Sequence, residues 1–156
     1  MDEIEIVELP AQTVLGLRRR GPYTQIPGML MEVFAVVMEK GAIPAGPPVS
    51  IYRQTTVAEV EQAEASGDAD LEVAIPVANR VRPVGDVANY ELPGGRFAKV
   101  IHRGPYEECT ATYQRLFAWI GAQGLAINGP IREVYLNDPR EVAPGEILTE
   151  ILAPVG

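Results

Sequence analysis

Cysteine and histidine are nearly absent from this 156-residue chain, which has one of each, Cys109 and His102. A lone cysteine excludes an intramolecular disulfide and any metal site built from several cysteines. A lone histidine likewise excludes a histidine-rich metal centre. The sequence therefore predicts a protein that uses no metal and no other cofactor.

Long apolar runs and excess positive charge are also missing. No apolar run approaches the ~18 residues of a membrane-spanning helix, and no basic-then-apolar leader opens the sequence. We therefore expect a cytoplasmic protein that does not enter a membrane. The net charge of −8 repels a phosphate backbone. The one basic run, at residues 18–20, is typical of a solvated strand end, so we expect no direct nucleic-acid binding.

The tetrapeptide Arg-Gly-Pro-Tyr occurs twice, at residues 20–23 and 103–106, a separation of 83 positions. With that offset held, thirteen identities without a gap connect positions 8–52 with positions 91–135. Further along, the offset falls to 78, where LEVAIPV matches TEILAPV. A register kept for so long indicates an internal duplication.

The repeat predicts one domain, at residues 1–156, with a module at about 4–77, a linker at 78–86 and a second module at about 87–155. Within each module a short apolar strand leads into the Gly-Pro of the tetrapeptide, which suits a strand-to-helix turn. Apolar residues then recur with helical spacing. The positions are Leu30, Val33, Phe34 and Val37 in the first module and Tyr113, Leu116, Phe117 and Ile120 in the second.

Two strands should close each module, so each is expected to be β-α-β-β. The closing strands are predicted at 49–55 and 71–77, and at 132–136 and 147–155; a further short strand is predicted at 4–7, and a polar surface helix or loop at 58–70. Gly41 and Gly124 fit the ends of the two helices. Each module has a small sheet with one helix and would be only marginally stable alone, so the modules should share a sheet or a core.

The ordered segments HRGPYEECTATYQRLFAWI, GPIREVYLNDP and LTEILAPV resemble the GyrI-like small-molecule-binding family. That family includes the gyrase-inhibitory protein and effector-binding domains of AraC-type and MerR-type bacterial multidrug regulators. The resemblance implies an α+β fold, a tandem pseudo-twofold duplication of an SHS2-like β-α-β-β module. It also implies a groove between the modules that binds bulky, often aromatic and cationic molecules through a glutamate anchor.

Positions that differ between the modules are better candidates for function than the shared tetrapeptide. Glu133 has Ser50 as its counterpart, so the fold does not require an acid there. Glu133 and Tyr135 are two apart on a strand and share a face. We expect Val134 and Leu136 to pack on the helix, so that Glu133 faces the groove with a raised pKa. The alternative is an exposed strand carboxylate paired with Arg132 or another surface base.

Five further residues are candidates for ligand contact. Tyr106 and Tyr23 open the two helices, Tyr113 belongs to the second helix, and Trp119 replaces Val36 beside the apolar stripe. Glu150 lies on the strand expected beside Glu133, and two close carboxylates would raise one pKa. A structural role competes for each of them: Glu150 is mirrored by Glu72, and a tryptophan on a helix also suits the core.

Three functions are compatible with these residues. No helix-turn-helix segment flanks the domain, so we expect a stand-alone protein that binds amphipathic, cationic or aromatic small molecules. The resemblance also allows a hydrolase of cyclopropane-containing genotoxic natural products. In it Glu133 would be the general base on water and Tyr135 a donor to the developing oxyanion. The third, a protein–protein module acting on gyrase, has only the family resemblance behind it, and no protein partner is specified.

Overall fold

The structure is a computed structural model, and it describes residues 3–53 and 56–156. The chain divides into two compact units. We call Ala11–Pro93 the inner unit, and Met1–Pro10 together with Gly94–Gly156 the terminal unit. No helix of the described residues is long and apolar enough to cross a membrane.

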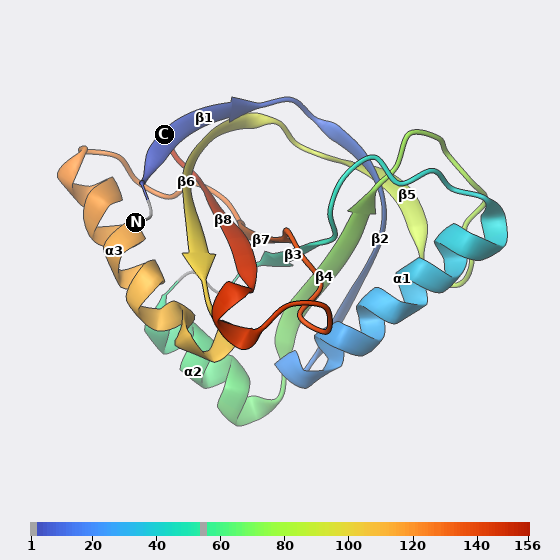
Figure 1. Cartoon of the computed structure of the whole chain (residues 1–156), viewed down its shortest axis with the longest axis horizontal. Helices are drawn as coiled ribbons and strands as arrows, with labels where there is room; N and C mark the ends of the chain where they lie inside the picture. Colours follow the sequence, from blue (N-terminus) through green and yellow to red (C-terminus); the bar gives the residue numbers. More distant parts are fainter. Residues whose placement is uncertain (1–2, 54–55) are drawn as a thin grey trace. The chain divides into compact units, whose positions relative to one another are not determined.

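The inner unit has a four-stranded antiparallel sheet in the order β3-β4-β2-β5. Its strands are β2 (Gln12–Gly21), β3 (Val49–Tyr52), β4 (Ala69–Pro76) and β5 (Ala88–Leu92), and its helices are α1 (Ile26–Lys40) and α2 (Val57–Ser66). Helix α1 packs on β4 and β2 (Figure 1). The polar segment at 58–70, where a helix or loop was expected, therefore contains a helix and the start of β4.

The terminal unit repeats this plan with the order β7-β8-β6-β1, also antiparallel. Its elements are β1 (Glu5–Leu9), β6 (Gly95–Arg103), α3 (Cys109–Ala122), β7 (Ile131–Tyr135) and β8 (Leu148–Pro154). Helix α3 packs on β6, beside which it runs in Figure 1. The fold is α+β, as expected; the pseudo-twofold relation and the groove stay predictions.

Strand pairing is equivalent in the two units. Ser50 pairs with Val73 in the inner unit, and Glu133 pairs with Ile151 in the terminal unit. The offsets between these pairs are 83 and 78, the two offsets found in the sequence. The sequence alignment therefore matches structurally equivalent positions, while the common origin of the units stays an inference from sequence.

The first strand of each repeat pairs outside the expected module. β1 precedes β2 in the chain but pairs with β6, and β5 precedes β6 but pairs with β2. Each of these strands is followed by a proline, Pro10 or Pro93, which has no N–H to continue a ladder. The chain passes between units at these points, so residues 5–9 belong with the second repeat and 88–92 with the first.

Both copies of the tetrapeptide form the expected strand-to-helix turn. Pro22 and Pro105 precede short 3₁₀ turns, at Tyr23–Gln25 and Tyr106–Glu108, that lead into α1 and α3. At the far ends of the helices, Gly41 has φ 68° and Gly124 has φ 71°. This left-handed conformation is cheap only for glycine.

The apolar stripe of α1 differs from the expected one. Met29, Val33, Val36 and Val37 are buried, whereas Phe34 is 39% exposed. The core side of the helix is thus rotated from the predicted stripe toward Val36. The predicted stripe of α3 does pack in its core, and Trp119, the counterpart of Val36, is partly buried against the same core.

Candidate functional site

Glu133 lies on the face of its sheet that α3 covers. Residues directly opposite in an antiparallel pair share a face, and the partner of Glu133 is Ile151, a core residue that packs with Leu116 of α3. The expectation that Val134 and Leu136 pack on the helix is therefore wrong. Val134 pairs with Glu150, on the opposite face.

Helix α3 supplies a hydrogen-bond donor to this carboxylate. The hydroxyl of Tyr113 donates to Oε2 of Glu133 in a short hydrogen bond. Near the start of α3, the ring of Tyr106 meets that of Tyr135 edge-on, with centroids 5.6 Å apart and planes at 69°. Three of the predicted aromatic residues thus gather around the predicted acid.

The phenols and the thiol near Glu133 have raised pKa values. Burial raises the pKa of the Tyr113 phenol well above its usual value, and the negative charge of Glu133 adds to the effect. Burial, then Glu133, likewise raises the pKa of Tyr106. For the Cys109 thiol the same causes, with a further contribution from Glu107, give a pKa of about 12.

We call Tyr106, Cys109, Tyr113, Glu133 and Tyr135 the Glu133 cluster. It combines the carboxyl group of Glu133 with three phenols and a thiol. Because their pKa values are raised, the Tyr106 and Tyr113 phenols and the Cys109 thiol are protonated at neutral pH. Cys109 is a buried free thiol and lacks the depressed pKa of a nucleophilic cysteine. The cluster can attract a cation or accept a proton, and it offers aromatic surface around the carboxylate.

His102 of β6 holds the turn that carries Tyr106. Its Nε2 lies 2.9 Å from the carbonyl oxygen of Pro105, and its Nδ1 lies 2.7 Å from Oγ1 of Thr112 on α3. A carbonyl only accepts, so Nε2 carries the proton, and in the neutral imidazole Nδ1 accepts from Thr112. His102 therefore connects β6 to the residue immediately before Tyr106 and to α3.

Thr149 of β8 lies between these two groups of residues. In the sheet it is opposite Tyr135 on one side and His102 on the other, so all three share the α3 face. Its side chain is fully buried, and its Oγ1 has no hydrogen-bond partner among the described residues. Buried hydroxyls in proteins normally have a partner, so Thr149 is an unused polar group beside Tyr135.

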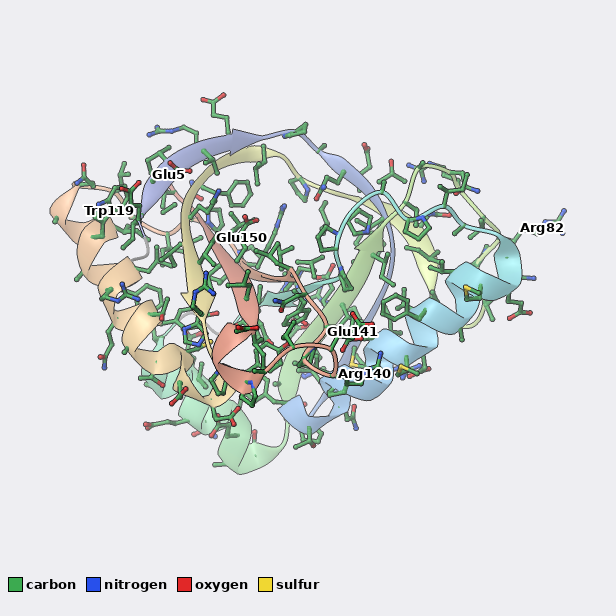
Figure 2. All side chains as sticks on the ribbon, in the orientation of Figure 1. Glu5, Arg82, Trp119, Arg140, Glu141 and Glu150 are labelled. Carbon is green, nitrogen blue, oxygen red and sulfur yellow. The ribbon has the colours of Figure 1, made fainter. Side chains whose placement is uncertain are left out.

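The remaining predicted residues lie elsewhere. Glu150, labelled on β8 in Figure 2, has its Oε2 3.8 Å from Nζ of Lys99. It lies on the opposite face of the sheet from Glu133, so the expected close pair of carboxylates is wrong. Trp119 is near the C-terminal end of α3 (Figure 2) and packs against the terminal-unit core. Tyr23 belongs to the inner unit, where its ring is 6.1 Å from that of Tyr52.

The sequence-based interpretation missed two polar residues on the α3 face, Thr112 and Thr149. The signal was present in the alignment, since their counterparts are Met29 and Leu71, both buried in the inner-unit core. An apolar-to-polar difference at a core position is the same kind of signal that identified Glu133. Among the described residues, no group of three His, Cys, Asp or Glu side chains could hold a metal ion.

The model of one protein family, the GyrI-like small-molecule-binding domain, matches residues 2–155. The chain belongs to this family. Membership covers the whole domain, so both units and the Glu133 cluster are parts of a GyrI-like domain. The resemblance inferred from the ordered segments is thereby confirmed.

Several solved structures share the GyrI-like fold. The EcmrR C-terminal domain matches with a TM-score of 0.87 and 21% identity, over 100% of this chain and 98% of that one. In a cryo-EM structure of EcmrR with DNA, the match spans 57% of the EcmrR chain. A hydrolase encoded by lin2189 from Listeria innocua matches with a TM-score of 0.66 and 16% identity, over 99% and 92%.

The structure of SAV2435 bound to tetraphenylphosphonium matches with a TM-score of 0.60 and 13% identity, over 99% of this chain and 94% of that one. At such identities these likenesses show a common fold and do not transfer a ligand or an activity.

Proposed function

We propose that this GyrI-like domain binds bulky amphipathic small molecules, cationic or aromatic, with Glu133 as the electrostatic anchor. The observation that carries the proposal is the Glu133 cluster itself. A half-buried carboxylate is placed by β7 against α3, and a phenol donates to it while two further aromatic rings lie nearby. Its counterpart in the inner unit is a serine, so the fold alone does not call for this acid.

The chemistry of the cluster favours a cationic aromatic ligand. In a partly desolvated setting, the attraction between a carboxylate and a delocalised cation is stronger than in water. Tyrosine rings contribute apolar area and a negative ring face, which also favour such cations. The net charge of −8 adds a long-range attraction. SAV2435, which has the same fold, was solved bound to the cation tetraphenylphosphonium.

A direct test is fluorescence titration with a rhodamine or phenanthridinium dye, and calorimetry with tetraphenylphosphonium, on the wild type and Glu133→Gln. We expect the dissociation constant for each cation to rise about tenfold or more, because a charge-assisted contact contributes roughly 1.5–3 kcal/mol. A neutral aromatic of similar size should lose much less affinity.

Glu150→Gln is the matched control. It removes the same charge from the neighbouring strand but on the opposite face. If the two variants lose affinity equally, only the overall charge matters and Glu133 is not the anchor. Unchanged cation affinity in Glu133→Gln would reject the anchor outright.

Hydrolysis of strained electrophiles is a second candidate, favoured by the shared face of Glu133 and Tyr135. Glu133 would take a proton from water while the water oxygen bonds to the electrophilic ring carbon. The strained carbon–carbon bond breaks, and the electron pair moves to a conjugated carbonyl oxygen that Tyr135 stabilises by donating a hydrogen bond. The thiol of Cys109, with a pKa of about 12, is protonated and is not a competing nucleophile.

Mass spectrometry after incubation with a cyclopropane-bearing alkylator tests this chemistry. A water adduct that forms with the wild type and is lost in Glu133→Gln and Tyr135→Phe would establish it. Tyr52→Phe is the control, since Tyr52 is the inner-unit counterpart of Tyr135. If the alkylator binds but no water adduct forms, the domain binds its ligand without hydrolysing it. If turnover persists in both variants, Glu133 and Tyr135 are not the catalytic residues.

A further inference from the structure

Helix α1 has an apolar face that points away from its own core. Met31 is 62% exposed, Met38 is 82% exposed and Phe34 is 39% exposed. Sulfur atoms are drawn in yellow along this helix in Figure 2. The equivalent positions of α3 are Gln114, Gly121 and Phe117, and of these only Phe117 is a large apolar residue. Large exposed apolar side chains that gather on one helix mark an interaction surface.

The exposed face has the spacing of a helix-pairing seam. Gly28, Met31, Ala35 and Met38 are separated by three, four and three residues, which is the a/d pattern of a heptad, and all four are exposed. They lie on the other side of α1 from its buried residues. A Cβ added at Gly28 would meet nothing within 4 Å, so this end of the seam is open. Small residues occupy both a positions and methionine occupies both d positions.

We propose that this seam binds the α1 helix of a second copy of the chain, in an antiparallel pair about a two-fold axis. In an antiparallel pair each a position faces a d position of the partner helix. Met38 would then face Gly28 of the other copy, and Met31 would face Ala35. Every layer combines one large and one small side chain, which is the arrangement that fills space without voids or clashes.

A parallel pair of the same two helices fits the seam less well. A parallel pair would place glycine against glycine and methionine against methionine, with alternating voids and crowding. A two-fold antiparallel pair instead uses the same patch on both copies, as closed homodimers do. The seam is complementary to itself in this one direction, and that identifies a second copy as the partner.

The charge beside the seam does not oppose the pairing. Glu32 lies next to the seam and would approach its own copy across the two-fold axis. It is already bonded by the Arg19 guanidinium, with Nη1 to Oε2 at 2.6 Å and Nη2 to Oε1 at 2.9 Å. This bidentate pair offsets the like-charge repulsion. On the other side, Phe34 would meet Phe34 of the second copy, which adds apolar contact.

The seam has only four layers, so the interface is small. Interfaces below about 1,200 Å² are typical of reversible, weak association. We therefore expect a monomer–dimer equilibrium in the micromolar range or weaker, seen as a concentration-dependent sedimentation coefficient of the full chain.

Ala35→Leu is the decisive variant. It makes the surface more apolar but fills the space that Met31 of the second copy would occupy. We expect the dimer dissociation constant to rise about tenfold, since overpacking a close-packed site costs about 1–3 kcal/mol. Tighter association in Ala35→Leu would mean non-specific hydrophobic contact and would overturn the proposal. Met31→Glu should also weaken the dimer, while Gln114→Glu, the same charge change at the equivalent position of α3, should not.

Crosslinking tests the direction of the pair. The double variant Met31→Cys/Ala35→Cys should form interchain disulfides under mild oxidation, because these positions face each other only in the antiparallel pair. Met31→Cys alone should not, since position 31 would face itself only in a parallel pair. The native Cys109 is buried and does not interfere. Crosslinking of the single variant, or a monomer at every concentration, would reject the proposal. The proposal would also be rejected if the protein were monomeric and the Met31→Glu variant lost dye binding. The seam would then be part of the ligand-binding site.

Discussion

Glu133 in the terminal unit and Ser50 in the inner unit occupy equivalent positions in the sheets of their units, yet their surroundings differ. Ser50 is fully buried on the face that carries Val73 of the core. Glu133 is half-buried and accepts a hydrogen bond from Tyr113, where the inner unit has Leu30. The carboxylate and its donor are thus both absent from the inner unit.

Further differences on the same face accompany this pair. Thr112, Thr149 and Cys109 of the terminal unit replace Met29, Leu71 and Ile26 of the inner unit. Each exchange replaces a large apolar side chain with a smaller or polar one. The inner unit therefore keeps an apolar core under α1, whereas the terminal unit has given up part of that core for a polar cluster under α3. We infer that the terminal unit carries the chemistry and the inner unit is closer to pure scaffold.

The largest predicted effect comes from introducing a glutamate into the inner unit at position 50, the counterpart of Glu133. Ser50→Glu should lower the free energy of unfolding by about 4 kcal/mol at pH 7, because it places a carboxylate at a fully buried position where Leu30 stands in place of the Tyr113 donor. Urea denaturation followed by circular dichroism measures this loss. Adding Leu30→Tyr to Ser50→Glu should recover about 1 kcal/mol, because it supplies the donor that Tyr113 supplies to Glu133.

Glu133→Ser is the reciprocal control and should cost about 2 kcal/mol, because it removes the acceptor of the Tyr113 hydroxyl. If Ser50→Glu were no more costly than Glu133→Ser, the inner-unit position would not be an apolar core position. The contrast between the two units would then have to be abandoned.

Much of this contrast was predictable from the sequence, because the repeat aligned Ser50 with Glu133 without any structure. The strand-to-helix turns and the glycine-capped helix ends also followed from local chemistry. The face of the sheet on which Glu133 lies could not be predicted in this way. Alternation along 132–136 predicts only that Glu133 and Tyr135 share a face. Which face meets the helix depends on the pairing with β8, and that is a long-range property.

The pairing of β1 with β6 and of β5 with β2 was equally unpredictable from the sequence. Nothing local in residues 5–9 indicates that they pair with residues 95–99. Propensity and alternation identify a strand but not its partner. The hydrogen bonds of His102 were hidden for a related reason. They join β6, the turn and α3, and a lone histidine in a strand carries no sequence signal of such partners.

The sheet faces that point away from α1 and α3 provide a second contrast. In the inner unit, Tyr90 lies over Gly16 and donates to Oε2 of the buried Glu72 at 2.7 Å. Arg53 forms an ion pair with Oε1 of the same carboxylate at 2.7 Å. The terminal unit has Lys99 where the inner unit has Gly16, and Val7 where it has Tyr90.

Exchanging this pair gives the next prediction. Gly16→Lys should destabilise the protein by about 3 kcal/mol, because the new side chain would overlap the Tyr90 ring. Gly16→Lys/Tyr90→Val, which copies the Lys99 and Val7 pair, should be within about 1 kcal/mol of Tyr90→Val alone. The double-mutant cycle from thermal or urea unfolding measures this coupling. If the double-mutant cycle showed no coupling, the Tyr90 ring would not be the reason that position 16 requires a glycine.

A surface ion pair gives the smallest effect. Arg18 donates to Asp70 through Nε at 2.9 Å and Nη2 at 2.6 Å, whereas the terminal unit has Ile101 and Leu148 at these positions. The hydrogen bond from Arg18 holds the pKa of Asp70 below its usual value.

A depressed carboxyl pKa stabilises the fold above the unfolded pKa of about 3.9, and the contribution is lost as the pH falls through the folded value. Asp70→Asn should therefore lower the stability by about 0.5–1 kcal/mol at pH 6, since Arg18 is mostly solvated. The difference from wild type should shrink below about pH 4, and thermal unfolding across a pH series measures it. Asp68→Asn, at the exposed partner of Arg20, is the control and should have a smaller effect at every pH. A deficit of Asp70→Asn that stayed constant down to pH 2 would show that the carboxylate charge is not its origin.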